Sequence, residues 1–150
     1  MTTSLHIHGI SIDFVNFWDF DNKDSYSSKL EYAKEDALRR DITINCMFYN
    51  INEAKMEDFT GKGLEDLRNG MIRTPLEPVD TFSNTPLSIL RSIRFATRFE
   101  FDLDPKMFEA IRDPRPRLQL ATKTCIESRG YEIVKIIGSK NAGRSITLLG

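Results

Sequence analysis

One amphipathic helix constrains the fold of this chain more than any other segment. The stretch NTPLSILRSIRFATRF, residues 84–99, predicts a helix over residues 87–99. Thr85-Pro86 is a good helix start, because a hydroxyl can cap a helix and proline is tolerated in the first turn. One helix face is apolar and another is cationic. The apolar face holds Ile89, Leu90, Ile93 and Ala96, and the cationic stripe holds Arg91, Arg94 and Arg98.

Strand patterns occupy the first half of the chain. Residues 5–14 alternate apolar and polar side chains with one slip, which predicts a hairpin turning near Gly9. His6 and His8 share one face of this pattern, and we favour solvent-facing strand positions over a metal pair. Further along, the sequence predicts a helix over 31–40, strands over 42–51 and 56–59, and a helix over 64–69 that stops at Gly70.

Helix signals dominate after residue 70. The segment LDPKMFEAI and the run over residues 118–137, which contains Gly130, predict two more helices. Strand signals almost vanish in this half. The change of character places a soft boundary near residues 70–80 and favours an α+β chain.

Charge and composition exclude some broad classes. The 21 basic and 22 acidic residues nearly cancel, so any nucleic-acid binding must come from a local patch. No signal peptide and no long uncharged apolar run is visible, which predicts an intracellular protein and no membrane partner. Cytoplasm, nucleus and mitochondrion are not distinguished by the sequence.

The two cysteines do not predict a metal site. Cys46 and Cys125 lack the spacing of a zinc site, and each lies in an apolar run that favours a buried free thiol.

Two arginine groups are candidates for anion binding. Three arginines on one helix face repel each other, so we expect a compensating anion, either a carboxylate from elsewhere or a bound phosphate. By itself such a stripe favours a solvated or ion-paired face. In EDALRRDITIN, Arg40 lies where guanidinium groups can fork onto phosphate, and Asp41 and Asn45 can bond to ribose hydroxyls. A charge pair at a helix C-terminus explains that junction equally well.

The order of these segments resembles the CCA-adding tRNA nucleotidyltransferases of the class shared by bacteria and eukaryotes, within the poly(A) polymerase superfamily. The resemblance runs through IDFVNF, EDALRRDITINCMFYN, EDFTGKGLEDLRNGMIRTPLEP and TFSNTPLSILRSIRFATRFEF, and covers residues 10–105 closely. It implies the C-terminal part of a palm over residues 1–72, with a mixed sheet and helices. An all-helical neck that binds nucleotide and RNA would follow over residues 73–150.

The same resemblance implies partners and site residues. A complete enzyme of this family adds CMP and AMP to tRNA 3′ ends from CTP and ATP, with Mg²⁺ as its metal. Carried over by motif, Arg40 contacts the nucleotide and Asp41 lies near its sugar. Arg91 and Arg94 are the neck arginines that hold the nucleotide.

The chain departs from the family pattern where catalysis needs it most. We find no glycine-rich motif and no DxD metal-binding pair on palm strands, and Asp13 is a single carboxylate. We therefore expect no metal on this chain and assign no catalytic residue. Thr85 and Ser88 occupy the places of the family's base-reading aspartate and arginine, which predicts weak base selection.

The departures indicate a partial and degenerate copy of the enzyme that is inactive alone. The alternative is a non-catalytic nucleotide-binding or RNA-binding module that associates with a full-length enzyme. A third possibility is an incomplete gene product, since a missing strand leaves an unpaired sheet edge.

Overall fold

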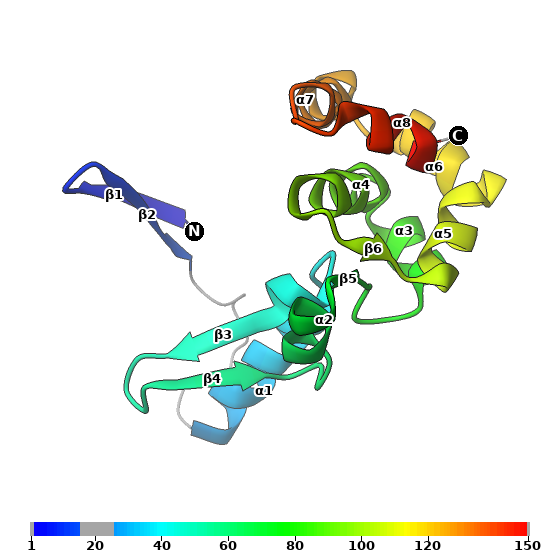
Figure 1. The fold of residues 1–150 in the computed structure, drawn as a ribbon. Helices are drawn as coiled ribbons and strands as arrows, with labels where there is room; N and C mark the ends of the chain where they lie inside the picture. The colour runs from blue at the N-terminus through cyan, green and yellow to red at the C-terminus, as the bar shows by residue number, and fades with distance from the viewer. Residues whose placement is uncertain (1, 16–25, 150) are drawn as a thin grey trace. The chain divides into compact units, whose positions relative to one another are not determined.

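The computed structural model describes residues 2–15 and 26–149 (Figure 1). The chain divides into two compact units, Met1–Asp36 and Ala37–Gly150. The first contains the strands β1 (Thr2–Ile7) and β2 (Ile10–Val15), and α1 (Tyr26–Leu38) begins in it. The second contains small two-stranded sheets and most of the helices, so the expected α+β class is confirmed.

The elements of the second unit follow one another closely along the chain. In order they are η1 (Thr43–Cys46), β3 (Met47–Asn50), β4 (Lys55–Asp58), α2 (Gly63–Asn69), β5 (Met71–Ile72), α3 (Pro78–Asn84), α4 (Ser88–Phe99), β6 (Asp102–Leu103), α5 (Pro105–Arg112), α6 (Pro114–Lys123), α7 (Ile126–Ile137) and α8 (Ala142–Leu149).

The predicted hairpin at the start of the chain is confirmed. β1 and β2 pair antiparallel, with Leu5 opposite Ile12 and Ile7 opposite Ile10. The turn is His8-Gly9, and both residues have positive φ, which matches the right-handed twist of the strands. His6 lies in β1 and His8 in the turn, and both side chains are exposed. The apolar side chains gather on one face of the hairpin.

The strand predicted over residues 42–51 is wrong in its first half. Thr43–Cys46 forms a 3₁₀ turn, and the strand begins only at Met47. The turn is fixed by long-range bonding, because the Thr43 N–H donates to the Arg73 carbonyl at 2.8 Å instead of to a strand neighbour. The rest of the prediction holds, since β3 and β4 form an antiparallel pair with Met47 opposite Asp58.

The predicted helix over residues 87–99 is the central element of the second unit. The apolar face predicted for it is buried, with Ile93 and Ala96 at 0% exposure. It packs against α3, α7, α8 and the parallel pair β5–β6 (Figure 1). The strands β5 and β6 were not predicted, because two residues each are too short for a period-2 pattern. The core around this helix includes Ile72, Phe82, Met107 and Ile111.

The helices differ from the prediction in several places. No side chain caps α4, which starts at Ser88, so the capping role expected of Thr85 is wrong. The run over residues 118–137 is broken into α6 and α7, because Thr124 and Cys125 have extended backbone. The helices α3 and α8 were not predicted.

The two cysteines differ in burial. Cys46 is buried as expected, but Cys125 is exposed, which corrects the prediction of two buried thiols.

Two glycines give a matched test of packing in this fold. A Cβ added at Gly63 would lie 2.8 Å from the Thr43 carbonyl oxygen, whereas a Cβ at Gly130 would meet nothing within 4 Å. We expect Gly63→Ala to lower the free energy of unfolding by about 1 to 3 kcal/mol. Gly130→Ala, inside α7, is expected to raise it by about 0.5 to 1 kcal/mol. Urea denaturation measures both, and equal effects of the two changes would contradict the packing at Gly63.

Candidate functional site

The arginines of α4 converge on one buried carboxylate from α7. Arg94 Nε lies 2.6 Å from Glu132 Oε2, and Arg91 Nε lies 3.5 Å from Glu132 Oε1. Glu132 is 4% exposed. Of the two compensating anions expected for the stripe, the structure therefore supplies the carboxylate. Two guanidinium groups share one negative charge, so the cluster keeps an excess of one positive charge.

The members of this arginine stripe differ in how far they are open to a ligand. The side chain of Arg94 is 14% exposed and stacks on the Phe95 ring at 4.2 Å. The side chain of Arg91 is 41% exposed, and its ion pair uses Nε. Within the described residues, no hydrogen bond uses the terminal nitrogens of Arg91. Arg91 is therefore better placed than Arg94 to donate to a phosphate.

Arg40 and Asp41, the other predicted site residues, lie in a second cluster around Asn45. Arg40 Nη1 donates to the Asn45 carbonyl at 2.6 Å, and the Arg40 guanidinium lies 4.5 Å from the centre of the Phe48 ring. Asn45 Nδ2 donates to Asp41 Oδ1 at 3.0 Å. The structure thus holds Arg40 and Asp41, which precede η1, against Asn45 of the η1 turn. Arg91 and Arg94 form a separate cluster around Glu132.

The two positions expected to read a base differ in burial. Thr85 is exposed at the end of α3. Ser88 is 1% exposed, and its hydroxyl has no hydrogen-bond partner. Ser92, one turn further along α4, has the same unpaired buried hydroxyl. The structure therefore gives these positions no charged group and no forked donor.

The unpaired hydroxyl of Ser88 leads to a stability prediction. Removing a buried polar group that lacks a partner removes its desolvation cost, so Ser88→Ala is expected to raise the free energy of unfolding by about 1 kcal/mol. The matched control is Thr97→Val. Thr97 Oγ1 donates to the Ile93 carbonyl at 2.8 Å and lies 2.8 Å from Ser145 Oγ, so its loss is expected to destabilise the chain. Thermal melting of both variants checks the opposite signs, and a loss of stability in Ser88→Ala would contradict the unpaired hydroxyl.

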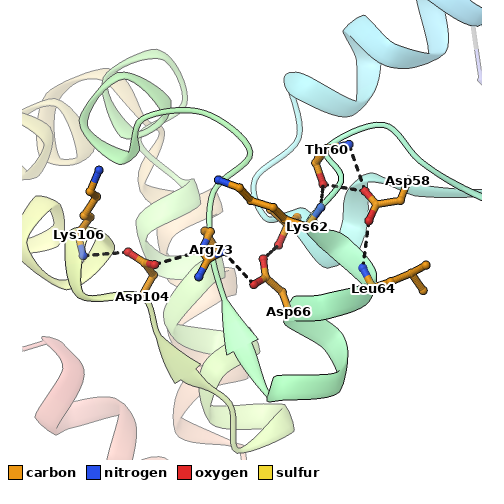
Figure 2. Close-up of polar contacts among 9 residues, drawn as sticks. Asp58, Thr60, Lys62, Leu64, Asp66, Arg73, Asp104 and Lys106 are labelled. Carbon is orange, nitrogen blue, oxygen red and sulfur yellow. Dashed lines mark hydrogen bonds and ion pairs between the residues drawn. The ribbon is translucent and has the colours of Figure 1, made fainter.

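An ion-pair network that the sequence alone did not indicate joins α2 to the segments that follow β5 and β6 (Figure 2). Arg73 Nη1 lies 3.3 Å from Asp66 Oδ1, and Arg73 Nε donates to Asp104 Oδ2 at 3.1 Å. Asp66, 2% exposed, also accepts from the Thr43 hydroxyl at 2.6 Å. The local sequence around Arg73, in MIRTPLEP, and around Asp66, in GLEDL, does not indicate that these two residues form an ion pair. The network spans the palm–neck boundary predicted after residue 72, and that division stays a prediction.

The carboxylate of Asp58 accepts hydrogen bonds from the loop before α2 and from the first turn of that helix (Figure 2). Burial tends to raise its pKa, but hydrogen bonds from the Thr60 hydroxyl and from the backbone N–H groups of Leu64, Thr60 and Gly61 together lower the pKa below its ordinary 3.8. The lowered pKa means that the unfolded chain binds a proton more readily than the folded chain. The stabilisation from Asp58 is therefore present above the ordinary pKa and lost as the pH falls through the lowered value.

Carboxylates in the described part of the chain do not form a metal centre. No group of three or more His, Cys, Asp or Glu residues there could hold a metal ion. The Asp-x-Asp string at Asp102 and Asp104 is paired with arginines, Asp102 with Arg144 at 2.7 Å. Asp13 Oδ1 accepts from the Ser4 hydroxyl at 2.6 Å. The described residues therefore do not fit a two-magnesium site.

Comparisons with known proteins agree on one family. The family model described as the poly A polymerase head domain matches residues 5–73. The mitochondrial CCA tRNA nucleotidyltransferase of Saccharomyces cerevisiae is 40% identical over 143 residues, which is 91% of this chain and 26% of the yeast protein. This chain therefore spans about a quarter of that relative's length. No helix among the described residues is long and apolar enough to span a membrane.

Solved structures with the same fold carry related descriptions. A CCA-adding enzyme in complex with ATP superposes with a TM-score of 0.80 and 29% identity, covering 98% of this chain and 33% of that one. The Thermotoga maritima CCA-adding enzyme complexed with tRNA gives a TM-score of 0.75 and 29% identity, again over 98% of this chain and 33% of that one. The match covers both the strand-containing part and the helical part.

Proposed function

Because this chain belongs to the family of the CCA-adding tRNA nucleotidyltransferases, we propose that it provides the nucleotide-holding part of such an enzyme. In this proposal residues 1–72 are palm and residues 73–150 are neck. Arg91 and Arg40 donate to the phosphates of CTP or ATP, Asp41 lies near the sugar, and Arg94 supports Arg91 in holding the nucleotide. The acceptor in a complete enzyme is the 3′ end of a tRNA.

The shared Glu132 is the observation that carries this proposal. A buried carboxylate fixes two guanidinium groups on one helix face and neutralises only one of their charges. The remaining charge, with an Arg91 side chain that is 41% exposed, suits a triphosphate. An ion-paired face contains such a carboxylate too, so the phosphate is favoured by the excess positive charge and by the exposure of Arg91.

The same proposal assigns no catalysis to this chain alone. Nucleotidyl transfer needs metal ions to neutralise charge on the attacking and leaving oxygens, and the described carboxylates do not fit two of them. Incubating the purified chain with tRNA lacking its 3′ CCA, radiolabelled CTP and Mg²⁺ tests this. We expect no CMP incorporation above a blank without protein, and incorporation that scales with the amount of chain would refute the claim.

Base selection is expected to be weak in this chain. Thr85 and Ser88 offer no charged acceptor and no forked donor, and Ser88 is buried. We therefore expect CTP, ATP, GTP and UTP to bind with affinities within about threefold of one another, because phosphate contacts are common to all four. Titration of each nucleotide into the chain measures this. A tenfold preference for CTP and ATP would contradict the roles given to these two positions.

A second candidate is a non-catalytic interaction module that associates with a full-length enzyme. The observation that favours it is the β1–β2 hairpin, whose apolar face is largely exposed. The side chains on that face are Leu5, Ile7, Ile10, Ile12 and Phe14, with exposures from 38% to 65%. Size-exclusion chromatography of the chain mixed with a complete CCA-adding enzyme tests this, and separate elution at micromolar concentrations would exclude it.

A further inference from the structure

Two aromatic rings lie next to Arg40 in the second unit. The guanidinium carbon of Arg40 lies 4.5 Å from the centre of the Phe48 ring. The Phe59 ring meets the Phe48 ring at 63°, with the ring centres 5.6 Å apart, which is the favoured edge-to-face arrangement. The cation therefore rests on a ring that is itself held by a second ring.

The register of β3 and β4 brings the two rings together. Phe48 lies opposite Glu57 in the antiparallel pair, and Phe59 comes directly after β4, two residues beyond Glu57. Side chains two residues apart along a strand point to the same face, and diagonal neighbours on adjacent strands are within reach of aromatic side chains. Tyr49, the next residue of β3, belongs to the opposite face. One face of this strand pair therefore carries both rings.

The guanidinium group of Arg40 is held at one face and at one edge. The Phe48 ring covers the face, and Nη1 donates to the Asn45 carbonyl at 2.6 Å. Because a guanidinium group is planar, a ring against its face fixes the plane, and a hydrogen bond at its edge fixes the rotation within that plane. The N–H donors lie at the edge, so the ring contact does not use them. Together the two contacts define the direction in which the donors point.

Neither core packing nor the helix dipole accounts for this arrangement. The two rings are half-buried, and within the described part of the chain neither belongs to the hydrophobic core around α4. Arg40 follows the C-terminus of α1, whose dipole attracts a cation but does not orient its plane. A ring against the guanidinium face does orient it. Such orientation matters where an arginine has to meet an anion with its donors.

We propose that Phe48, held by Phe59, positions Arg40 for the phosphates of the nucleotide. The inference rests on the proposed function, in which Arg40 donates to those phosphates. Phe48 is a positioning residue, because it contacts the guanidinium group and acts on the nucleotide only through it. An arginine that is already ordered in the free chain loses less side-chain entropy when the nucleotide binds. The aromatic pair therefore raises nucleotide affinity without touching the nucleotide.

Calorimetric titration of CTP into the full chain and its variants tests this role. Phe48→Leu keeps a large apolar side chain but removes the ring face. We expect the affinity for CTP to fall about threefold to tenfold, as for the loss of a partly exposed cation–π contact. Phe48→Tyr keeps a ring against the guanidinium group, so its affinity is expected to stay within about twofold of the parent.

A double-mutant cycle with Arg40→Ala separates positioning from a general effect on the fold. Arg40→Ala alone is expected to weaken CTP binding about tenfold, the size of one hydrogen bond to a charged group. If Phe48 acts through Arg40, Phe48→Leu should change the affinity by less than about 1.5-fold in the Arg40→Ala background. A structural role would produce the same loss in both backgrounds. Phe59→Leu, which leaves the contact with Arg40 in place, is a second variant with an expected loss of about twofold in the parent alone.

The matched control is Tyr49→Leu, which removes a ring from the same strand. Tyr49 is 60% exposed and lies opposite Met56, and among the described residues no cation lies over its ring. We expect its affinity for CTP to stay within about twofold of the parent, because no cation–π contact is lost. Thermal melting of each variant shows that the compared chains are folded.

The outcomes distinguish this role from the nucleotide function. Absence of CTP binding by the parent would refute the nucleotide function and the positioning role with it. Unaltered binding in Arg40→Ala would overturn the positioning role together with the phosphate contact given to Arg40. If the parent binds CTP and Arg40→Ala weakens binding, an equal loss for Phe48→Leu in both backgrounds, or no more loss than for Tyr49→Leu, would overturn the positioning role alone.

Discussion

Replacing Glu132 with glutamine is expected to lower the free energy of unfolding by about 3 kcal/mol, since a buried carboxylate that serves two guanidinium groups is lost. Arg91 and Arg94 would then face each other without a counter-charge. Glutamine keeps the size of the side chain and one acceptor oxygen, so cavity formation adds little to the loss. Urea denaturation followed by circular dichroism measures the change.

The control for this prediction comes from the same helix. Glu127 is exposed in the first turn of α7, so Glu127→Gln is expected to change stability by less than about 0.5 kcal/mol. The pair of variants removes one carboxylate each and differs only in burial and partners. Equal effects of the two changes would mean that Glu132 does not hold the arginines of α4.

The second large effect is expected at Asp66. Asp66→Asn removes a charge that is 2% exposed, weakening its bond from Thr43 and its ion pair with Arg73. We expect a loss of about 2 to 3 kcal/mol, below that at Glu132 because Arg73 keeps Asp104. Glu65→Gln, an exposed neighbour in α2, is the control and should be nearly neutral. A neutral Asp66→Asn would contradict the network shown in Figure 2.

Periodic segments of this fold could be predicted from the sequence, and contacts between distant residues could not. The burial of Ile93 and Ala96 followed from helical spacing, and the turn at Gly9 followed from strand alternation. The 3₁₀ turn at Thr43 depends on the Arg73 carbonyl, thirty residues away, so no local pattern reveals it. β5 and β6 exist because they pair with each other, which two-residue strands cannot signal.

The candidate site shows the same limit. The spacing of Arg91, Arg94 and Arg98 predicted a common face and a need for an anion. It could not identify Glu132, because that residue lies 38 positions from Arg94 and outside any pattern the arginines define. Ser88 was expected to lack a base-reading group, but its burial depends on the packing of α4 and has no signature in the sequence.

The central claim, that this chain holds a nucleotide through Arg91, is tested most directly by calorimetric titration of CTP. We expect saturable binding by the parent chain and a loss of about 10-fold to 100-fold in affinity for Arg91→Ala, the size of one hydrogen bond to a charged phosphate. Arg94 keeps Glu132 paired in that variant, so its melting temperature should stay close to that of the parent. Arg112→Ala, which removes an exposed arginine of α5 that lies over the Phe108 ring, is expected to leave CTP binding unchanged. Absence of saturable binding by the parent chain, or equal affinities for Arg91→Ala and Arg112→Ala, would contradict the claim.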